Sequence, residues 1–198
     1  MKIKIMACTS LLFAISISAN AAGDCSGCPT DRECSDRGIN YYNMGEYLQA
    51  RSCFEKACYL NPGVGNEGIG CLNLGTLYYN GHGVSRDLSQ AKNYYKKSCE
   101  LRNADGCLNL GVLYFNGQGG RPSRDYAEWY FKESCNFGSQ DGCNYHRSLE
   151  QARIQMSHER ENQRRQIELQ ERWLQEMNRP RTTQCGRDFI GNVTCTSW

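Results

Sequence analysis

Cysteine is the residue type in this chain that combines reactive chemistry with regular spacing. Of the 198 residues, 13 are cysteine. Cys71, Cys107 and Cys143 follow one another at intervals of 36 residues, and Cys99 and Cys135 are separated by the same interval. Thiols at fixed spacing can form disulfides, ligate a metal or carry out redox chemistry. Which of these applies depends on the elements that carry them.

Three pairs of cysteines have separations that suit structural disulfides. In two of them the cysteines are eight residues apart, which places one at the end of a helix and the other at the start of the next. A short turn between antiparallel helices brings such positions within the reach of a disulfide. The third pair is the same connection lengthened by a glycine-rich insertion, residues 63–68. The predicted bridges are Cys58–Cys71, Cys99–Cys107 and Cys135–Cys143.

The segment Cys25-Ser26-Gly27-Cys28 has the C-x-x-C spacing of zinc and redox sites. No second C-x-x-C and no nearby histidine completes a zinc site, and no strand pattern surrounds the motif. We therefore favour disulfides here too, and expect no metal and no cofactor. The pairing stays open: Cys34 is expected to bond to Cys25 or Cys28, and Cys53 to the cysteine that is left.

The 36-residue interval extends beyond the cysteines. Cys71-Leu72-Asn73-Leu74-Gly75 returns as Cys107-Leu108-Asn109-Leu110-Gly111. A fixed period of this length is typical of stacked helical hairpins, in which one unit cannot bury its apolar face alone. Gly81 suits a left-handed helix end, and Asp87 or Ser85 can cap the helix that follows. We predict an all-α fold, an α/α superhelix of about three hairpins whose seams are closed by disulfides.

A serine motif offers a different chemistry. Ser89-Gln90-Ala91-Lys92 spells S-x-x-K, the nucleophile motif of penicillin-recognising enzymes. The chain has no K-T-G, and in the neighbouring units Leu48 and Asp125 take the place of the serine. The histidines are scattered singly and form no catalytic dyad: His82, His146 and His158. The sequence therefore favours a protein that is not an enzyme, with Ser89 and Lys92 as candidates for weak β-lactam hydrolysis in the alternative.

One unit also resembles the Sel-1-like repeat, with the pattern L-G-x-x-Y-x-x-G-x-G-V followed by aspartate, alanine and tyrosine. The matching residues are Leu74, Gly75, Tyr78, Gly81, Gly83, Val84, Asp87, Ala91 and Tyr95. The third unit departs from the pattern at Gly120, where the valine would be. With its paired cysteines the chain resembles the exported cysteine-rich branch of this family, which includes the helicobacter cysteine-rich proteins. The resemblance covers about residues 31–146. Cysteine-rich relatives have been linked to penicillin binding and weak β-lactam hydrolysis, so the resemblance supports the enzymatic alternative.

The first residues are typical of an export signal. Lys2 and Lys4 precede an apolar run and then Ala19-Asn20-Ala21, an A-x-A cleavage site, so residues 1–22 are predicted to be a signal peptide. Its removal takes Cys8 away and leaves an even number of cysteines. We expect a fully disulfide-bonded chain in the periplasm or secreted, with no membrane span in the mature protein.

Three further parts follow the signal peptide in our prediction. Residues 23–146 form the repeat domain, residues 147–180 a polar helix and residues 181–198 a hairpin closed by a Cys185–Cys195 disulfide, with Gly191 left-handed in its loop. Pairs of opposite charge four residues apart favour a solvated helix. The alternative is a dimerising or partner-docking helix that uses an apolar end, Trp173, Leu174 and Met177.

The predicted function is binding of a protein or an extended peptide, in an adaptor or host-contact role. The net charge of +2 argues against a nucleic acid as the partner. Solenoids of helical hairpins line their concave side with the first helix of each unit, and an asparagine amide can both donate to and accept from a peptide backbone. The predicted binding residues are Leu72, Asn73, Thr76, Tyr79, Asn80, Leu108, Asn109, Val112, Phe115 and Asn116.

Overall fold

The computed structural model describes residues 25–60, 67–179 and 183–197. The predicted signal peptide lies outside these residues. Within them the elements are a short 3-10 helix, seven α-helices and two strands: η1 (Cys25–Gly27), α1 (Asp31–Asn43), α2 (Tyr47–Tyr59), α3 (Ile69–Asn80), α4 (Leu88–Glu100), α5 (Ala104–Asn116), α6 (Arg124–Asn136), α7 (Gln140–Met177), β1 (Thr183–Arg187) and β2 (Val193–Ser197). The chain divides into two compact units, the first ending at His146 and the second beginning at Arg147.

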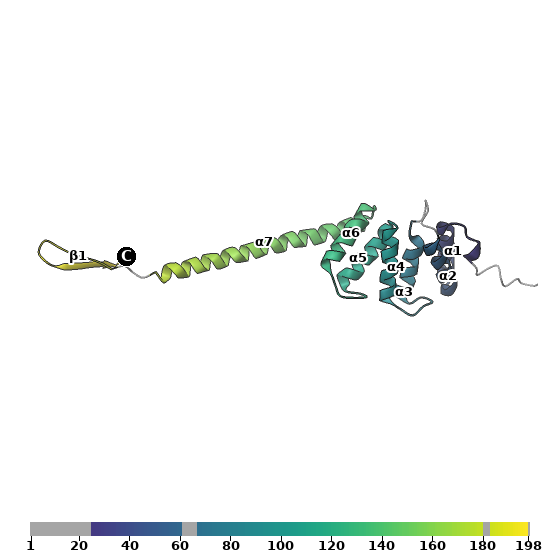
Figure 1. The fold of residues 1–198 in the computed structure, drawn as a ribbon, viewed down its shortest axis with the longest axis horizontal. Coiled ribbons are helices and arrows are strands. Elements are labelled where there is room, and N and C mark those ends of the chain that lie inside the picture. Colours follow the sequence, from purple (N-terminus) through teal and green to yellow (C-terminus); the bar gives the residue numbers. More distant parts are fainter. Residues whose placement is uncertain (1–24, 61–66, 180–182, 198) are drawn as a thin grey trace, which may run out of the picture. The chain divides into compact units, whose positions relative to one another are not determined.

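The first unit is a stack of helical hairpins (Figure 1). The helices pair as α1 with α2, α3 with α4 and α5 with α6, and each hairpin packs on the next through the α2–α3 and α4–α5 contacts. The first helices of successive hairpins also touch, α1 with α3 and α3 with α5. The predicted all-α solenoid is confirmed.

Side chains and glycines at the helix ends explain the hairpin boundaries. The Asp87 carboxylate accepts hydrogen bonds from the backbone N–H groups of Ser89 and Gln90, so Asp87 rather than Ser85 caps α4. Ser123 caps α6 in the same way. Gly81 ends α3 with a φ of 76°, the left-handed conformation that the sequence predicts for it.

Glycines inside the first helices let the second helices approach closely. A Cβ atom on Gly75 would lie 2.7 Å from the ring of Tyr95. Gly111 is placed in the same way against Phe131, also at 2.7 Å. Because real Cβ atoms do not approach other atoms so closely, only glycine fits these helix crossings. The repeat therefore depends on its glycines for packing as well as for its turns.

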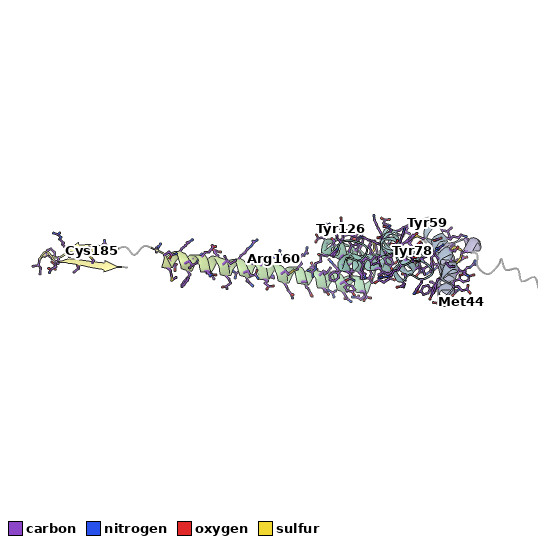
Figure 2. All side chains as sticks on the ribbon, turned by 90° about the horizontal axis from the view of Figure 1, so that it is seen from below. Met44, Tyr59, Tyr78, Tyr126, Arg160 and Cys185 are labelled. Carbon is purple, nitrogen blue, oxygen red and sulfur yellow. A yellow bond between two sulfur atoms is a disulfide. The ribbon has the colours of Figure 1, made fainter. Side chains whose placement is uncertain are left out.

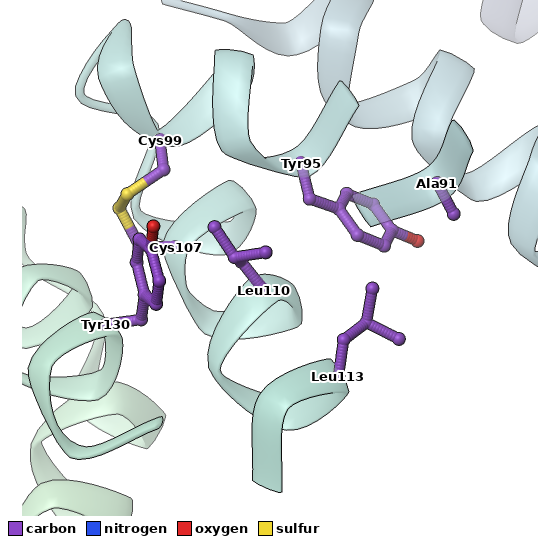
Figure 3. Close-up of a cluster of buried hydrophobic side chains, with 7 residues drawn as sticks. All are labelled: Ala91, Tyr95, Cys99, Cys107, Leu110, Leu113 and Tyr130. Atoms are coloured by element: carbon purple, nitrogen blue, oxygen red, sulfur yellow. A yellow bond between two sulfur atoms is a disulfide. The ribbon is translucent and has the colours of Figure 1, made fainter. Parts of the chain in front are cut away.

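A buried cluster links the second and third hairpins. Leu110 and Leu113 of α5 pack with Tyr95 of α4 and with the Cys99–Cys107 disulfide (Figure 3). Tyr130 of α6 joins the same cluster from the next helix. The core of this unit thus runs continuously across the seam between hairpins.

The predicted seam disulfides are confirmed. Each joins the end of a second helix to the first turns of the following helix, with Cα atoms 4.5–4.6 Å apart. This separation is within the range that disulfides require. The bridges are Cys58–Cys71, Cys99–Cys107 and Cys135–Cys143.

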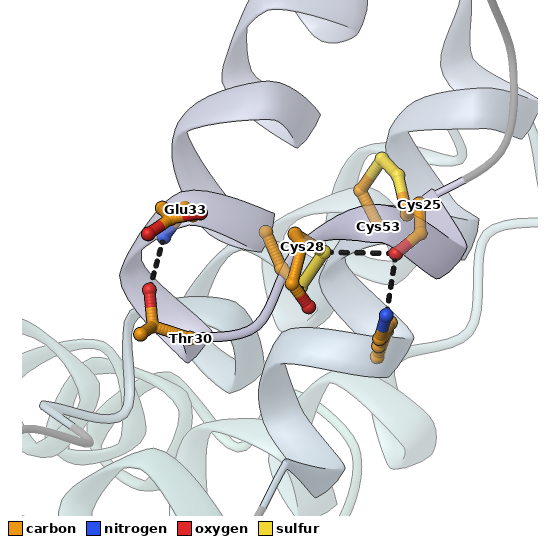
Figure 4. The surroundings of a disulfide bond; sticks show 7 residues. Cys25, Cys28, Thr30, Glu33 and Cys53 are labelled. Atoms are coloured by element: carbon orange, nitrogen blue, oxygen red, sulfur yellow. Dashed lines mark hydrogen bonds between the residues drawn. A yellow bond between two sulfur atoms is a disulfide. The ribbon is translucent and has the colours of Figure 1, made fainter. Parts of the chain in front are cut away.

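Two further bridges resolve the pairing that the sequence left open. Cys28 bonds to Cys34 and Cys25 bonds to Cys53, with Cα separations of 5.3 and 5.1 Å. The Lys56 ammonium donates a hydrogen bond of 2.7 Å to the Cys25 carbonyl oxygen, which holds η1 on α2 (Figure 4). The two cysteines of the C-x-x-C motif are therefore each bonded to a different helix and not to one another.

Helix α7 begins at Gln140, inside the predicted repeat domain, and continues through the predicted polar segment that starts at residue 147. Its first turn is built like the start of α5: a Cβ on Gly142 would meet the buried side chain of Ser134, as one on Gly106 would meet Ser98. The helix therefore starts as the first helix of a further repeat, and its polar part continues from there without a break.

Beyond residue 152 the side chains of α7 are all exposed, and they project on every side of it (Figure 2). The predicted charge pairs are present, with Arg165 3.3 Å from Glu161 and Arg172 3.5 Å from Glu168. In the described parts of the chain, no helix is both long enough and apolar enough to cross a bilayer.

The hairpin tail consists of β1 and β2 paired antiparallel, with Cys185 opposite Cys195. The disulfide between them is present, with Cα atoms 4.0 Å apart. Asp188 and Asn192 close the turn through a backbone hydrogen bond of 3.0 Å, and Gly191 has a positive φ of 90°. The loop thus contains the left-handed glycine that the sequence predicts.

Candidate functional site

The predicted binding residues form what we call the first-helix surface, contributed by α3 and α5. Within each helix they are two pairs of adjacent residues with a single residue between the pairs, three or four positions from each, so they cover one broad side of the helix. All ten are half-buried or exposed, so none is lost in the core. They are Leu72, Asn73, Thr76, Tyr79 and Asn80 from α3, and Leu108, Asn109, Val112, Phe115 and Asn116 from α5.

Several of these residues also brace the fold. The Thr76 hydroxyl donates to the Leu72 carbonyl oxygen at 3.0 Å and lies 3.3 Å from the Tyr95 hydroxyl. Burial raises the pKa of Tyr95, and the hydrogen bond with Thr76 opposes that change. Leu72 and Tyr79 pack against the buried cluster of α4 and α5. Only the exposed parts of the Leu72, Thr76 and Tyr79 side chains are therefore available to a ligand.

The asparagines are different. Asn73 and Asn109 occupy equivalent places on successive first helices and are half-buried. In the described part of the chain their side-chain amides make no hydrogen bond to another protein group. Each amide keeps two N–H donors and a carbonyl acceptor for another molecule.

Ser89 and Lys92 lie at the start of α4. Ser89 is exposed in the first helical turn, where its backbone N–H donates to the cap at Asp87. The Lys92 ammonium lies 3.8 Å from the centre of the Tyr114 ring on α5. The hydrogen bonds of the described residues include none between the serine hydroxyl and this ammonium.

A cavity of about 290 Å³ lies away from the first-helix surface, between α4 and α6. None of the ten predicted binding residues lines it. Its lining includes Trp129, Glu133 and Phe137. The sequence signal that could have revealed the cavity is that these three residues are not repeated between units. The equivalent residues one unit earlier are Asn93, Lys97 and Leu101.

The repeats match known families. Residues 68–103 and 104–138 each match the Sel1 repeat, and residues 32–64 match the tetratricopeptide repeat. The chain contains two Sel1 repeats. The matched boundaries fall between hairpins, so that the two Sel1 repeats correspond to α3 with α4 and to α5 with α6.

Two curated relatives of this chain come from Helicobacter pylori strain J99. The putative beta-lactamase HcpC is 36% identical over 81 residues, which cover 41% of this chain and 26% of HcpC. The beta-lactamase HcpA is 40% identical over 63 residues, which cover 32% of this chain and 23% of HcpA. The chain therefore spans about a quarter of the length of these relatives.

A solved structure supports the fold. The protective antigen c5321 of uropathogenic Escherichia coli, which displays an SLR fold, superposes with a TM-score of 0.51 at 24% identity. The superposition covers 58% of this chain and 24% of that chain. At this identity the likeness concerns the arrangement of helices alone.

Proposed function

We propose that the protein is an exported module that binds an extended segment of another polypeptide, in an adaptor or host-contact role. The supporting observation is the pair of half-buried amides of Asn73 and Asn109, which make no hydrogen bond within the described part of the chain. Half-buried polar groups of this kind gain most from a partner that can both donate and accept, as a peptide backbone does.

The spacing of the two helices suits an extended chain. Helices α3 and α5 are in contact, and packed helices lie about 8–10 Å apart. An extended chain advances about 3.3 Å per residue. Asn73 and Asn109 would therefore meet backbone groups about three residues apart, and Phe115, exposed at 44% further along α5, offers an apolar contact.

Export and the compartment belong to the same proposal. The six disulfides of the described residues persist in oxidising surroundings. The A-x-A signal at residues 19–21 supports the periplasm or secretion as the destination.

The test selects peptides from a displayed random library on the full-length protein and measures the affinity of the most enriched one by fluorescence anisotropy. Replacing both amides (Asn73→Ala with Asn109→Ala) should raise Kd about tenfold, because two hydrogen bonds of about 0.7 kcal/mol each are lost. Asn93→Ala is the matched control, since Asn93 is exposed on α4. An unchanged Kd in the double variant, with circular dichroism showing an intact fold, contradicts this function.

The second candidate function is weak hydrolysis of β-lactams. The names of HcpC and HcpA as beta-lactamases support it, together with the S-x-x-K motif at Ser89 and Lys92. The contact of Lys92 with Tyr114 favours the binding function, because it directs the ammonium to the neighbouring repeat.

A further inference from the structure

The cavity between α4 and α6 has aromatic walls. Trp129, Tyr130 and Phe137 line it from α6 and its C-terminal end. The rings of Trp129 and Tyr130 meet nearly edge to face, with centres 4.7 Å apart. The volume of about 290 Å³ suits one large side chain. The site can therefore hold a flat group against aromatic rings.

Three charged residues also line the cavity, the carboxylates Glu100 and Glu133 and the cation Lys96. Glu100 is paired with Lys96 of its own helix at 3.7 Å, but both side chains are about 60% exposed and such pairs are weak. Glu133 accepts a hydrogen bond from the Asn136 amide at 3.3 Å. A further cation nearby, Arg102, lies 5.3 Å from the Phe137 ring. Glu133 is thus the carboxylate that an incoming cation would neutralise.

The equivalent place one unit earlier, between α2 and α4, already contains a cation. There the Lys97 ammonium lies 3.5 Å from the centre of the Tyr59 ring. Burial, the Tyr59 hydroxyl and, as the smallest cause, the negative charge of Glu55 raise the pKa of Tyr94 to about 12. The chain thus supplies its own cation to an aromatic and acidic site at this seam.

The 36-residue register shows how the next seam differs. Lys97 is replaced by a carboxylate, and the cations of the chain at this seam lie elsewhere: Lys96 is paired with Glu100, and Arg102 lies over the Phe137 ring. In the α2–α4 seam the aromatic ring is Tyr59 of the earlier helix, whereas in the α4–α6 seam it is Trp129 of the later helix. A second carboxylate, Glu100, occupies the position equivalent to Tyr59. At the interval of 36 residues Lys97 aligns with Glu133, and Asn93 aligns with Trp129. Tyr59 belongs to the first hairpin and aligns with Glu100 at an interval of 41 residues.

We propose that this cavity binds an arginine side chain of a partner polypeptide. A guanidinium group is planar, stacks on aromatic rings and can donate to two carboxylates at once. It would stack on Trp129 and donate to Glu133 and Glu100. The site lies on the second helices, so it is separate from the first-helix surface and does not depend on the function proposed above.

The test titrates the full-length protein with N-acetyl-arginine amide and follows the indole N–H resonance of Trp129 by NMR, assigned with Trp129→Phe. A single anchor should bind in the millimolar range, about 4 kcal/mol. N-acetyl-citrulline amide, a neutral isostere, and N-acetyl-lysine amide should each bind at least tenfold more weakly. Equal shifts for arginine and citrulline, or equal affinity for arginine and lysine, overturn the proposal.

Variants of Glu133 sharpen the test. Glu133→Lys restores the charge pattern of the α2–α4 seam and should abolish arginine binding, whereas Glu133→Gln should weaken it at least fivefold. Asp125→Asn, at an exposed carboxylate of the same helix, is the matched control and should bind normally. Asn73→Ala with Asn109→Ala should also bind normally. Undiminished arginine binding by a folded Glu133→Lys variant contradicts the site.

Discussion

The Ser98 hydroxyl donates a hydrogen bond of 2.9 Å to the carbonyl oxygen of Gly68, across the width of one hairpin. Ser134 and Ala104 repeat it 36 residues later, also at 2.9 Å. Ser98 is fully buried, and it lies against Gly106 at the start of the following helix. One buried serine thus ties its own hairpin together and sets how closely the next one packs.

Ser98→Ala should lower the free energy of unfolding by about 1 kcal/mol, the usual net worth of one hydrogen bond. The loss stays modest because the Gly68 carbonyl also accepts from Leu72, and because Ala57 fills the same position in the first hairpin. Urea denaturation measures the change, with the exposed Ser52→Ala as control.

Gly106→Ala, in contrast, should cost about 1–3 kcal/mol, because the new methyl group meets the Ser98 side chain and lies 3.0 Å from the Cys99 nitrogen. A Gly106→Ala protein as stable as the wild type would show that the seam is looser than described.

The disulfides should differ in how much each contributes to the free energy of unfolding. Removing Cys99–Cys107 by paired alanines should cost about 2–3 kcal/mol, and removing Cys25–Cys53 about 3–4 kcal/mol, because the second closes 28 residues and the first only 8. Thermal unfolding of each paired variant under non-reducing conditions tests the order. Intact mass of the exported protein should show no free thiol, and several free thiols would contradict the bridges.

The stability of the protein should fall as pH rises from about 10 to 12. The pKa of Tyr94 is raised to about 12, first by burial and then by the Tyr59 hydroxyl and nearby negative charge. The unfolded chain, with a tyrosine pKa near 10, releases its proton earlier, so alkali favours unfolding. Below pH 10 this contribution is fully present. Urea midpoints measured at pH 9, 10 and 11 should decline less steeply in Tyr94→Phe than in the wild type, and identical slopes would refute the assignment.

Nitrocefin separates the two candidate functions. We expect any hydrolysis by the purified protein to be the same in Ser89→Ala as in the wild type, because Lys92 contacts Tyr114 and not the serine hydroxyl. Lys92→Met serves as the second variant. A rate that drops tenfold or more in both variants would make the protein a serine hydrolase.

The apolar end of α7 provides a test of self-association. Trp173 is 56% exposed and Leu174 43% exposed, near the end of a helix whose other side chains are mostly polar. We expect a monomer in sedimentation velocity at micromolar concentration, since the apolar residues are too sparse for a coiled-coil seam. A dimer that Trp173→Glu with Leu174→Glu abolishes would instead establish the docking helix.

Periodicity predicts most of this fold because it depends on residues that each unit repeats. Gly75 and Gly111, like the seam cysteines, can be assigned by counting along the chain. The disulfide partners of Cys25 and Cys28 could not be assigned in this way, because the repeat allows Cys34 to bond to either of them. Which of the two bonds to Cys34 depends on how η1 packs on α2.

The cavity at Trp129 escaped prediction for a related reason. It arises where the units differ, and its character depends on which side chains face each other across a seam. Helix α7 runs across residue 147, where the sequence divides the repeat domain from the polar helix, because the two share one continuous helical backbone.

The seam disulfides also affect what a protease can do to this chain. Arg102 is exposed in the loop between α4 and α5, inside the segment that Cys99 and Cys107 close. Cleavage after Arg102 would leave both pieces joined through the disulfide, and the helices on either side would remain packed. A nicked molecule outside the cell would therefore keep its shape, and fragments would separate only after reduction. Resistance to fragmentation is thus built in at the loops that join one hairpin to the next.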